Sequence, residues 1–385
     1  MVSMHGGDIA IVGAAETARL GKIPDQSALQ LHTEAAVRAL ADAGVSPAEV
    51  DGIANDSLPP FDISDYLGIR PRWVDGTWVG GCSSMLLVRH AAAAIAAGAA
   101  NVVLVTHGES GRSNVGQKPY TMEPASLRGQ FEVPFGGIAA YSAFTTPALA
   151  FLEGRGMSAR DLAVVTAAQR EWAVGNPRAA RNEPATVEDI LAGPEVAYPF
   201  TRDMCCVVTD GGGALVVMSA ERAGDLPSHS RAVYLLGSGE AAESALPSQM
   251  DQLDSFGAFR SASSDAFKSA GITHQDVDHI MFYDAFAHLP LYMLEDTGFV
   301  GRGESGAFFA EGHSRPGGDL PINTNGGGMS YTHTGRYGMF AMQEAVRQLR
   351  GEAFRQVDGV EISFVQGIGF MFGSAGSLVL SNRRP

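Results

Sequence analysis

Short apolar runs alternate along the chain with longer segments whose apolar residues recur at helical spacing. One apolar run covers residues 9–12 and ends at Gly13, and another covers residues 233–236 and ends at Gly237. An amphipathic segment and then a further apolar run follow each of them. Strands that alternate with helices in this order predict an α/β fold with largely parallel sheets and helices packed on their faces.

The pattern occurs twice. Residues 35–45 followed by Val50-Asp51 return as residues 262–272 followed by Val277-Asp278, at an offset of 227 residues. Both copies predict a helix that ends at a glycine, a short loop, and a strand entered through Val-Asp. We therefore predict a layered protein of two similar halves.

The halves also agree further along the chain. A Gly-rich turn, a second helix and a buried strand follow in residues 80–106 of the first half and in residues 326–365 of the second. We place the halves at residues 1–228 and 229–385. A less regular, Pro-rich and aromatic stretch at about residues 112–200 interrupts the first half. It is predicted to be an inserted loop region, which either shapes a binding cleft or serves as a dimer contact or cap.

Composition and charge narrow the function. The 385 residues, 45 % hydrophobic and 18 % charged, fill a large core of more than one domain. A net charge of −15 disfavours a nucleic-acid partner, although a local basic patch for an anionic ligand stays compatible with it. The N-terminal residues do not resemble a signal peptide. The most apolar helix, about residues 91–100, is too short to span a membrane.

The cysteine pattern favours a reducing, cytoplasmic environment. The three cysteines are Cys82, Cys205 and Cys206, an odd number with two of them adjacent, which suggests no disulfide framework. No Cys-x-x-Cys pair and no His-Glu metal motif occurs, so no metal site is expected.

Two glycine-rich turns carry candidate chemistry. Residues 77–85 predict a turn from a strand into a helix, where a thiol at Cys82 would gain acidity from the helix N-terminus. A small cysteine packed beneath the turn explains the same residues. Residues 323–338 combine glycines with Tyr331, His333 and Tyr337, residue types suited to proton transfer. A plain turn with an exposed histidine is the alternative there.

Tyr283 and Asp284 end a predicted strand. The carboxyl ends of strands in α/β sheets are common active-site positions, so both are candidate catalytic residues. A core tyrosine whose hydroxyl is satisfied internally is the alternative for Tyr283. His107 and Glu109 also follow a predicted strand, where they line a cleft or cap the turn.

Taken in order, these motifs resemble the thiolase superfamily, in its sterol-carrier-protein-type branch, over nearly the whole chain. The matching segments are Gly108-Glu109, Asn176-Pro177, Thr209-Asp210-Gly211, Tyr283-Asp284-Ala285-Phe286, Asn325-Gly326-Gly327, His333 and Gln348-Leu349-Arg350-Gly351. The resemblance implies an αβαβα fold, a homodimer and an acyl-CoA substrate, with no cofactor beyond the CoA of that substrate.

Both thiolase cysteines are missing from their expected positions. In thiolases the nucleophilic cysteine lies seventeen residues before the glycine that ends the following helix, which here resembles Gly98. That count places Gly81, and not Cys82, at the nucleophile's position. The second catalytic cysteine would fall near Val365, in the segment that continues to Gly367.

A thioester site without a nucleophile suits carbon–carbon cleavage. Thiolysis needs a thiolate to carry the acyl group, whereas retro-aldol cleavage needs only a base and a stabilised enolate. A steroid side-chain aldolase branch of the family is similar, with tyrosine in the Tyr-Asp-x-Phe motif and a small OB-fold partner that binds CoA. The resemblance implies a lyase that splits a bulky, steroid- or lipid-like 3-hydroxyacyl-CoA into a carbonyl compound and a shorter acyl-CoA.

Roles follow for the candidate residues. Tyr283 and His333 are predicted to form the acid/base pair, and backbone N–H groups near Gly81 and Gly367 to hold the enolate oxygen. Asp284, Tyr331 and Tyr337 are further participants of second choice. Two other functions fit the sequence: an acyltransferase that uses Cys82, and a non-catalytic subunit that carries lipid or acts as a scaffold.

Overall fold

The computed structural model describes residues 3–117 and 123–385. Residues 1–2, from the N-terminal segment judged unlike a signal peptide, and residues 118–122, from the predicted insertion, lie outside the described residues.

Two sheets of related strand order build the core and join edge to edge through β1 and β8 into one nine-stranded sheet. The strands of the first half are β1 (Ile9–Glu16), β2 (Gly52–Asn55), β3 (Trp73–Asp75), β4 (Val102–Ser110) and β7 (Asp210–Ser219). Those of the second are β8 (Val233–Ala242), β9 (His279–Phe282), β10 (Ile362–Gly369) and β11 (Ser374–Ser381). In the order β3-β2-β4-β7-β1-β8-β11-β10-β9, four strands on each side of the junction of β1 and β8 correspond, and β3 extends the first half by one further strand.

The expectation of largely parallel sheets is wrong. β2 pairs in parallel with β3 and β4, and β9 with β10, but β7 and β11 run antiparallel to both of their neighbours. The reason is visible at β11, which follows β10 through a tight turn. A short connection can join only antiparallel strands.

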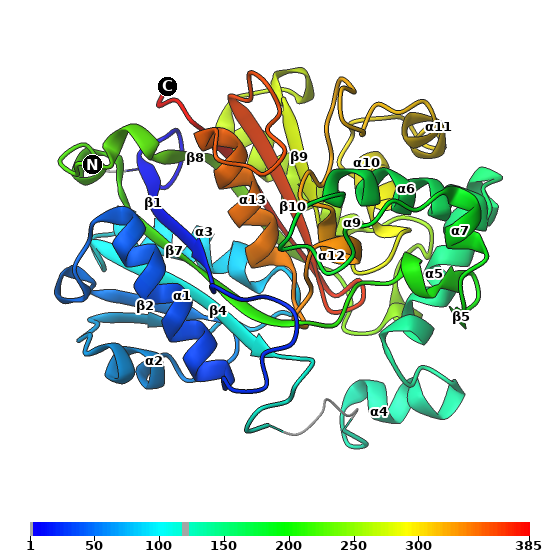
Figure 1. Ribbon diagram of the computed structural model, residues 1–385, viewed down its shortest axis with the longest axis horizontal. Coiled ribbons are helices and arrows are strands. Elements are labelled where there is room, and N and C mark those ends of the chain that lie inside the picture. The colour runs from blue at the N-terminus through cyan, green and yellow to red at the C-terminus, as the bar shows by residue number, and fades with distance from the viewer. Residues whose placement is uncertain (1–2, 118–122) are drawn as a thin grey trace.

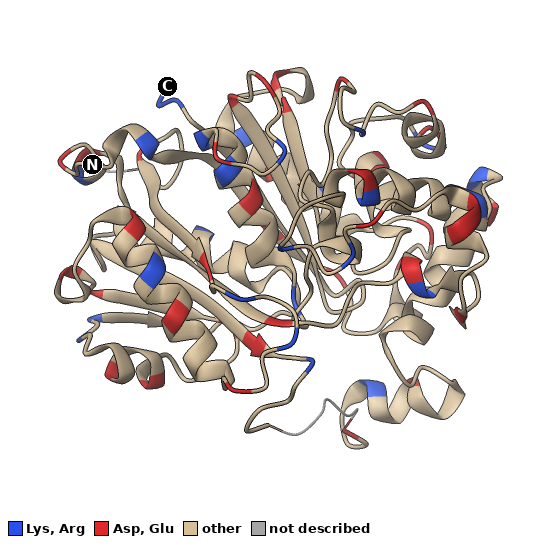
Figure 2. Ribbon diagram, viewed as in Figure 1, with Lys and Arg blue, Asp and Glu red and all other residues tan. Residues whose placement is uncertain are grey.

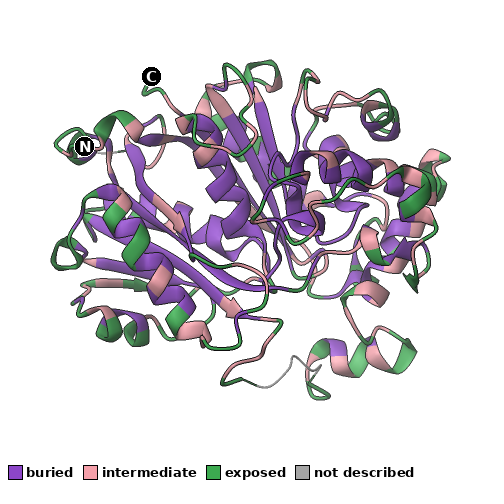
Figure 3. Cartoon of the chain, viewed as in Figure 1, coloured by how far each residue is buried: buried purple, intermediate pink, exposed green. Residues whose placement is uncertain are grey.

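Helices fill three layers around these two sheets, which confirms the predicted αβαβα fold (Figure 1). α1 (Ala28–Ala43) covers the outer face of the first sheet and α9 (Gly257–Ala270) that of the second. α3 (Ser83–Ala96) and α13 (Gly338–Arg350) contact each other and strands of both halves. Nearly every residue of α13 is buried, as a middle-layer helix requires (Figure 3).

Local geometry repeats between the halves. α1 ends at Gly44 with φ +72° and α9 at Gly271 with φ +69°, so the predicted glycine caps are confirmed. A Cβ on Gly13 would lie 2.2 Å from the carbonyl oxygen of Ala39. A Cβ on Gly237 would lie 2.1 Å from that of Ala266, so both strands need glycine where the outer helix crosses them.

The insertion is more regular than its proline content suggests. It contains α4 (Leu127–Phe131), α5 (Ala140–Arg155), α6 (Ala159–Ala173), α7 (Val187–Leu191) and the hairpin of β5 (Glu195–Ala197) with β6 (Phe200–Thr201). Pro147 lies inside α5 and is buried there. The proline content of this stretch therefore wrongly indicated that it was irregular. The remaining helices are α2 (Pro60–Leu67), α8 (Ala220–Ala223), α10 (Leu289–Asp296), α11 (Ser305–Ala310) and α12 (Gly327–Ser330).

Within residues 3–117 and 123–385, no single helix is long and apolar enough to cross a membrane. One pair of helical segments, Leu127–Phe135 and Ala140–Arg155, reaches that length and composition jointly but is bent by 68°.

Candidate active site

Tyr283 and His333 meet in the interior. Tyr283 directly follows β9, and its backbone N–H donates to the carbonyl of Gln366 in β10 (2.9 Å). His333 lies between α12 and α13. The Tyr283 hydroxyl oxygen is 2.9 Å from Nε2 of His333, and both side chains are buried. The two residues predicted to form the acid/base pair are thus in hydrogen-bond contact.

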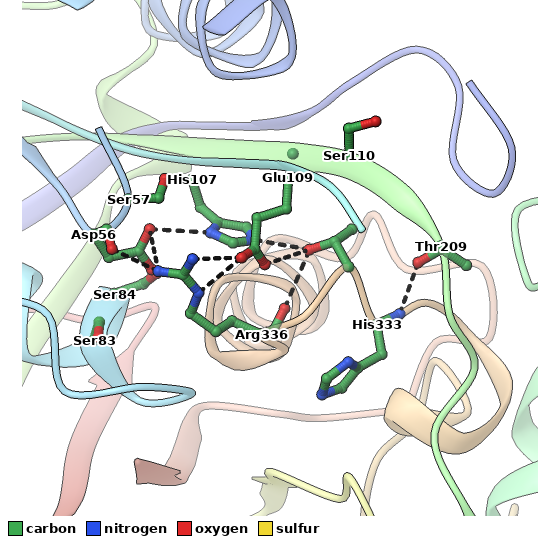
Figure 4. A network of polar contacts seen from close by, with 12 residues as sticks. Asp56, Ser57, Ser83, Ser84, His107, Glu109, Ser110, Thr209, His333 and Arg336 are labelled. Carbon is green, nitrogen blue, oxygen red and sulfur yellow. Dashed lines mark hydrogen bonds and ion pairs between the residues drawn. The ribbon is translucent and has the colours of Figure 1, made fainter. Parts of the chain in front are cut away.

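His333 is held by Thr209 at the start of β7. The backbone N–H of His333 donates to the Thr209 hydroxyl (3.0 Å), and the N–H of Thr209 donates to the carbonyl of His333 (3.1 Å; Figure 4). Burial lowers the pKa of His333 to about 4, so the imidazole is neutral at pH 7. A neutral imidazole has a free ring nitrogen that accepts a proton.

Tyr283 stays a protonated phenol at neutral pH. Burial raises its pKa well above the ordinary value, and the charges of Cys206 and Glu109 raise it further. The backbone N–H of Tyr337 and the charge of Arg336 act in the opposite direction. The pair therefore holds one transferable proton on the phenol and one free site on the imidazole.

Gly81 leaves room for the Tyr283 ring. A Cβ at position 81 would lie 2.5 Å from Cε2 and Cζ of Tyr283 and 2.6 Å from the carbonyl oxygen of Ile368. No side chain fits there without displacing the ring. The ring thus stands where the resemblance places the thiolase nucleophile. The Gly81 carbonyl accepts the N–H of Gly338, so the N-termini of α3 and α13 meet beside the pair.

The Cys82 side chain packs against the start of β11. The thiol is fully buried, its Sγ lies 3.5 Å from the Ser374 hydroxyl at the start of β11, and burial raises its pKa to about 12. Gly367 lies beneath it: a Cβ there would be 2.8 Å from Cβ of Cys82 and 2.6 Å from Sδ of Met85. This geometry fits the packing interpretation of Cys82, because a thiol is activated by a lowered pKa or an adjacent base.

Asp284 shapes the glycine-rich turn. Its carboxylate accepts the N–H groups of Gly328 (2.6 Å) and Met329 (3.3 Å), and burial raises its pKa well above the ordinary value. A Cβ on Gly327 would lie 2.1 Å from Oδ2 of Asp284. These two hydrogen bonds to the carboxyl group of Asp284 therefore hold α12 in place.

The two other candidate tyrosines differ in their distance from the pair. The Tyr337 ring packs edge-on against Tyr283 with centroids 5.9 Å apart, while its hydroxyl donates to Oδ1 of Asn325 (2.8 Å). Tyr331 donates to Oε2 of Glu16 (2.6 Å) and receives a hydrogen bond from Arg178 (3.2 Å). The Tyr337 ring therefore packs against the pair, whereas the hydroxyl of Tyr331 is bound by Glu16 and Arg178 instead.

An ionic network lies behind His333 (Figure 4). The Arg336 guanidinium lies between Asp56 and Glu109: Nη1 is 3.3 Å from Oδ1 of Asp56, and Nε is 3.2 Å from Oε1 of Glu109. His107 connects Oδ1 of Asp56 (3.2 Å from Nδ1) to the Thr334 hydroxyl (2.9 Å from Nε2).

The sequence prediction missed Asp56 and Arg336, although a signal for Asp56 existed. β2 and β9 are related by the offset of 227 residues, and the same offset places Asp56 where the second half has Tyr283. The repeat therefore pointed to both strand ends. For Arg336 the only signal was its closeness in sequence to His333.

Two surface cavities differ in charge, although acidic and basic residues are interspersed over both halves (Figure 2). A cavity of about 400 Å³ is lined by Arg112, Ala180, Arg181, Val196, Arg202, Cys205, Cys206, Val207 and Val208, with no acidic residue among these described residues. We call it the arginine cavity. A groove of about 550 Å³ between α1 and α13 balances its arginines against Glu16, Asp42 and Glu352. The arginine cavity adjoins the site, because the backbone N–H of Cys206 donates to the carbonyl of Ala285 (2.8 Å), two residues after Tyr283, and that of Val207 donates to the carbonyl of Gly328 (3.0 Å).

No group of three His, Cys, Asp or Glu side chains within residues 3–117 and 123–385 is arranged to hold a metal ion.

Known proteins resemble the chain over nearly its full length. Residues 239–382 match the family model described as thiolase C-terminal domain-like. The 17-hydroxy-3-oxo-4-pregnene-20-carboxyl-CoA lyase of Mycobacterium tuberculosis is 33% identical over 378 residues, covering 93% of this chain and 95% of that protein. The steroid side-chain-cleaving aldolase of Thermomonospora curvata is 31% identical, covering 92% and 93%.

Solved structures agree. The structure named Ltp2-ChsH2(DUF35) aldolase superposes with a TM-score of 0.91 at 28% identity and covers all of both chains. Human mitochondrial 3-ketoacyl-CoA thiolase, at 18% identity and a TM-score of 0.72, covers 98% of this chain and 99% of that chain and shares the fold. This chain is an enzyme of the thiolase superfamily and belongs to the sterol-carrier-protein-type branch that contains the steroid side-chain aldolases.

Proposed function

We propose that the chain is a retro-aldolase that cleaves a bulky 3-hydroxyacyl-CoA into a carbonyl compound and a shorter acyl-CoA. One observation carries the proposal: Tyr283 and His333 are in hydrogen-bond contact at 2.9 Å, with the Tyr283 ring over Gly81. A proton-transfer pair stands where acyl transfer would need a thiolate. The names of the two relatives above support a lyase on steroid-like CoA thioesters.

The reaction needs one proton to move and return. The 3-hydroxyl of the substrate gives its proton to the Tyr283 oxygen while the phenol proton passes to Nε2 of His333. The C2–C3 bond breaks, C3 becomes a carbonyl carbon, and the bonding electrons form an enolate of the shorter thioester. The imidazolium then returns its proton through Tyr283 to C2 of the enolate.

Backbone groups around Gly81 suit the enolate. The N-termini of α3 and α13 meet there, and helix N-termini favour negative charge. Enolate stabilisation by N–H groups near Gly81 and Gly367 stays part of the proposal. Asp284 and Tyr337 act as positioning groups in it, and Tyr331 has no part in the chemistry.

The arginine cavity suits the anionic end of the CoA thioester. Its lining combines three arginines with apolar valines, and phosphates pair well with guanidinium groups. We also propose a small OB-fold partner that completes the CoA site. The support is the structural neighbour whose name joins two components, Ltp2 and ChsH2(DUF35).

A homodimer through the free edge of β3 and a cytoplasmic location are also proposed. Val74 in β3 is half exposed, as are Phe61, Tyr66 and Trp78 nearby, and exposed apolar edge strands are sites of association. Three free cysteines agree with a reducing compartment.

The test is product analysis. The chain, alone and with an OB-fold partner, is incubated with a 3-hydroxyacyl-CoA that carries a polycyclic acyl group, and chromatography with mass detection follows both products. We expect the carbonyl compound and the shorter acyl-CoA in equal amounts. An acyl adduct on Cys82 would instead establish the acyltransferase. Cleavage that Tyr283→Phe and His333→Ala leave unchanged would show that the site assignment is wrong, and absence of cleavage for every tested substrate would favour the non-catalytic carrier.

A further inference from the structure

The buried Arg336 network joins the two halves immediately behind the catalytic pair. Asp56 follows β2, Glu109 belongs to β4, and Arg336 lies three residues after His333. Arg336 also donates from Nη1 to the carbonyl of Asp56 (2.6 Å). Its side chain is 12% exposed and that of Asp56 is completely buried, so solvent screens these charges little.

The backbone between His333 and Tyr337 is tightly packed against its neighbours. Gly335 adopts φ +134°, and a Cβ there would lie 2.6 Å from Oε2 of Glu109. A Cβ on Gly111 would lie 2.0 Å from the carbonyl oxygen of Thr334. Gly335 thus leaves room for the carboxylate of Glu109, and Gly111 leaves room for the carbonyl of Thr334, so the segment from His333 to Arg336 packs closely against the end of β4.

The network reaches the pair at two points. Tyr337, the residue after Arg336, packs its ring edge-on against Tyr283. Thr334, the residue after His333, has its hydroxyl 2.9 Å from Nε2 of His107 and donates to Oε2 of Glu109 (3.4 Å). The charge of Arg336 lowers the pKa of both Tyr283 and His333, whereas Glu109 raises that of Tyr283. The other titratable groups whose charge acts on the pair are Cys206, on Tyr283, and His107, on His333.

We propose that Arg336 is a positioning residue whose charge, fixed by Asp56 and Glu109, favours the proton-poor state of the Tyr283–His333 pair, and that Glu109 moderates this effect. Arg336 touches neither substrate nor reacting atoms in this role. It makes negative charge that develops on the Tyr283 oxygen less costly, and it keeps His333 unprotonated before the reaction. The inference rests on the proposed function only in assigning proton transfer to this pair.

Substitutions of Arg336 and Glu109 are expected to shift the pKa values of the pair in opposite directions. Arg336→Gln removes a positive charge, so the pKa of His333 should rise by about one unit, a tenfold change in proton affinity. Glu109→Gln removes a negative charge, so the alkaline limb of the kcat profile, set by Tyr283, should move to lower pH. A purely structural network would not separate the two variants by direction.

The first measurement is an NMR titration of the folded chain labelled with ¹³C-histidine, with His333 assigned from the His333→Asn spectrum. Arg222→Gln, which removes an exposed arginine paired with Glu49, is the matched control. Arg336→Lys, which keeps the charge, should leave His333 close to its original pKa. A folded Arg336→Gln variant in which His333 titrates as in Arg222→Gln overturns the proposal.

The second measurement is the pH profile of kcat, and it applies even where Arg336→Gln does not fold. A shift of the Glu109→Gln alkaline limb to higher pH, or no shift, overturns the proposal. The NMR result is independent of turnover. Absence of cleavage by the wild-type chain would therefore count against the proposed function and leave the inference about Arg336 to be judged by the titration.

Discussion

The residues that follow the equivalent strands β2 and β9 differ in charge. Asp56 after β2 and Tyr283 after β9 are related by the offset of 227 residues, and both are buried. Asp56 is charged: Arg336 and His107 counter the effect of burial and hold its pKa far below the usual range. Tyr283 faces a neutral imidazole, and burial holds its pKa well above the usual range. The duplicated scaffold thus carries one charged carboxylate and one neutral tyrosine–histidine pair at equivalent strand ends.

The difference between the two strand ends predicts whether a substitution lowers turnover or stability. The second-half end touches the reacting atoms in the proposed reaction, so changes there should abolish turnover and leave the fold intact. The first-half end balances buried charges, so changes there should reduce stability first. The expected effects below run from the largest to the smallest.

Removing either member of the reactive pair should have the largest effect. We expect Tyr283→Phe and His333→Ala to lower kcat about 10²- to 10⁴-fold, because the proton relay loses its acid or its acceptor. Thermal unfolding midpoints should stay near that of the wild type. Tyr331→Phe, which alters a tyrosine held by Glu16 away from the pair, is the control and should keep most activity. A larger loss for Tyr331→Phe would contradict the assignment of the pair.

A side chain at Gly81 should displace the ring of Tyr283. The Cβ of Gly81→Ala would lie 2.5 Å from two ring atoms, and overpacking of this kind costs about 1–3 kcal/mol of transition-state stabilisation or fold stability. Where that cost falls on the transition state, we expect kcat/KM to fall about 5- to 160-fold. Gly76→Ala is the matched control, because no atom lies closer than 3.8 Å to a Cβ there. Equal activity of the two variants would show that Tyr283 does not depend on the missing side chain.

Asp56 and Asp284 should differ in their effect on stability. Asp56→Asn leaves a buried ion network short of one charge, at a cost of about 3 kcal/mol, while Asp284→Asn alters hydrogen bonds to backbone N–H groups only, at about 1 kcal/mol. Urea unfolding midpoints at pH 7 measure both. Equal losses would contradict the contrast between a charged support and a turn-shaping carboxyl group.

The pH dependence of these two variants should run in opposite directions. The lowered pKa of Asp56 contributes stability that is present above the unfolded value near 4 and lost as pH falls, so the Asp56→Asn defect should shrink in acid. The raised pKa of Asp284 stabilises the protonated form, and that contribution is lost as pH rises from about 4 toward the folded value. The Asp284→Asn defect should therefore shrink toward neutral pH.

The sequence predicted the fold and the proximity of Tyr283 and His333, because both leave local or repeated signals. The offset between residues 35–53 and 262–280 reported the duplicated layers, and the Tyr283 and His333 motifs reported the pair. It did not reveal the antiparallel placement of β7, whose partners β1 and β4 are distant in sequence, although the short turn between β10 and β11 was a local signal for β11. Nor did it show that Tyr331 turns away from the pair, because side-chain direction in a turn depends on partners such as Glu16 that are distant in sequence.

The smallest expected effect concerns the arginine cavity. Arg202→Ala should raise KM for the acyl-CoA substrate about fivefold, equivalent to about 1 kcal/mol for an exposed charge, and leave kcat unchanged. The same acyl group on N-acetylcysteamine lacks the phosphates of CoA, so its KM should not change. Arg38→Ala, in the charge-balanced groove between α1 and α13, is the matched control and should alter neither value. An equal rise in KM for both thioesters would mean that the cavity contacts the acyl group or shapes the site, and that the phosphates bind elsewhere.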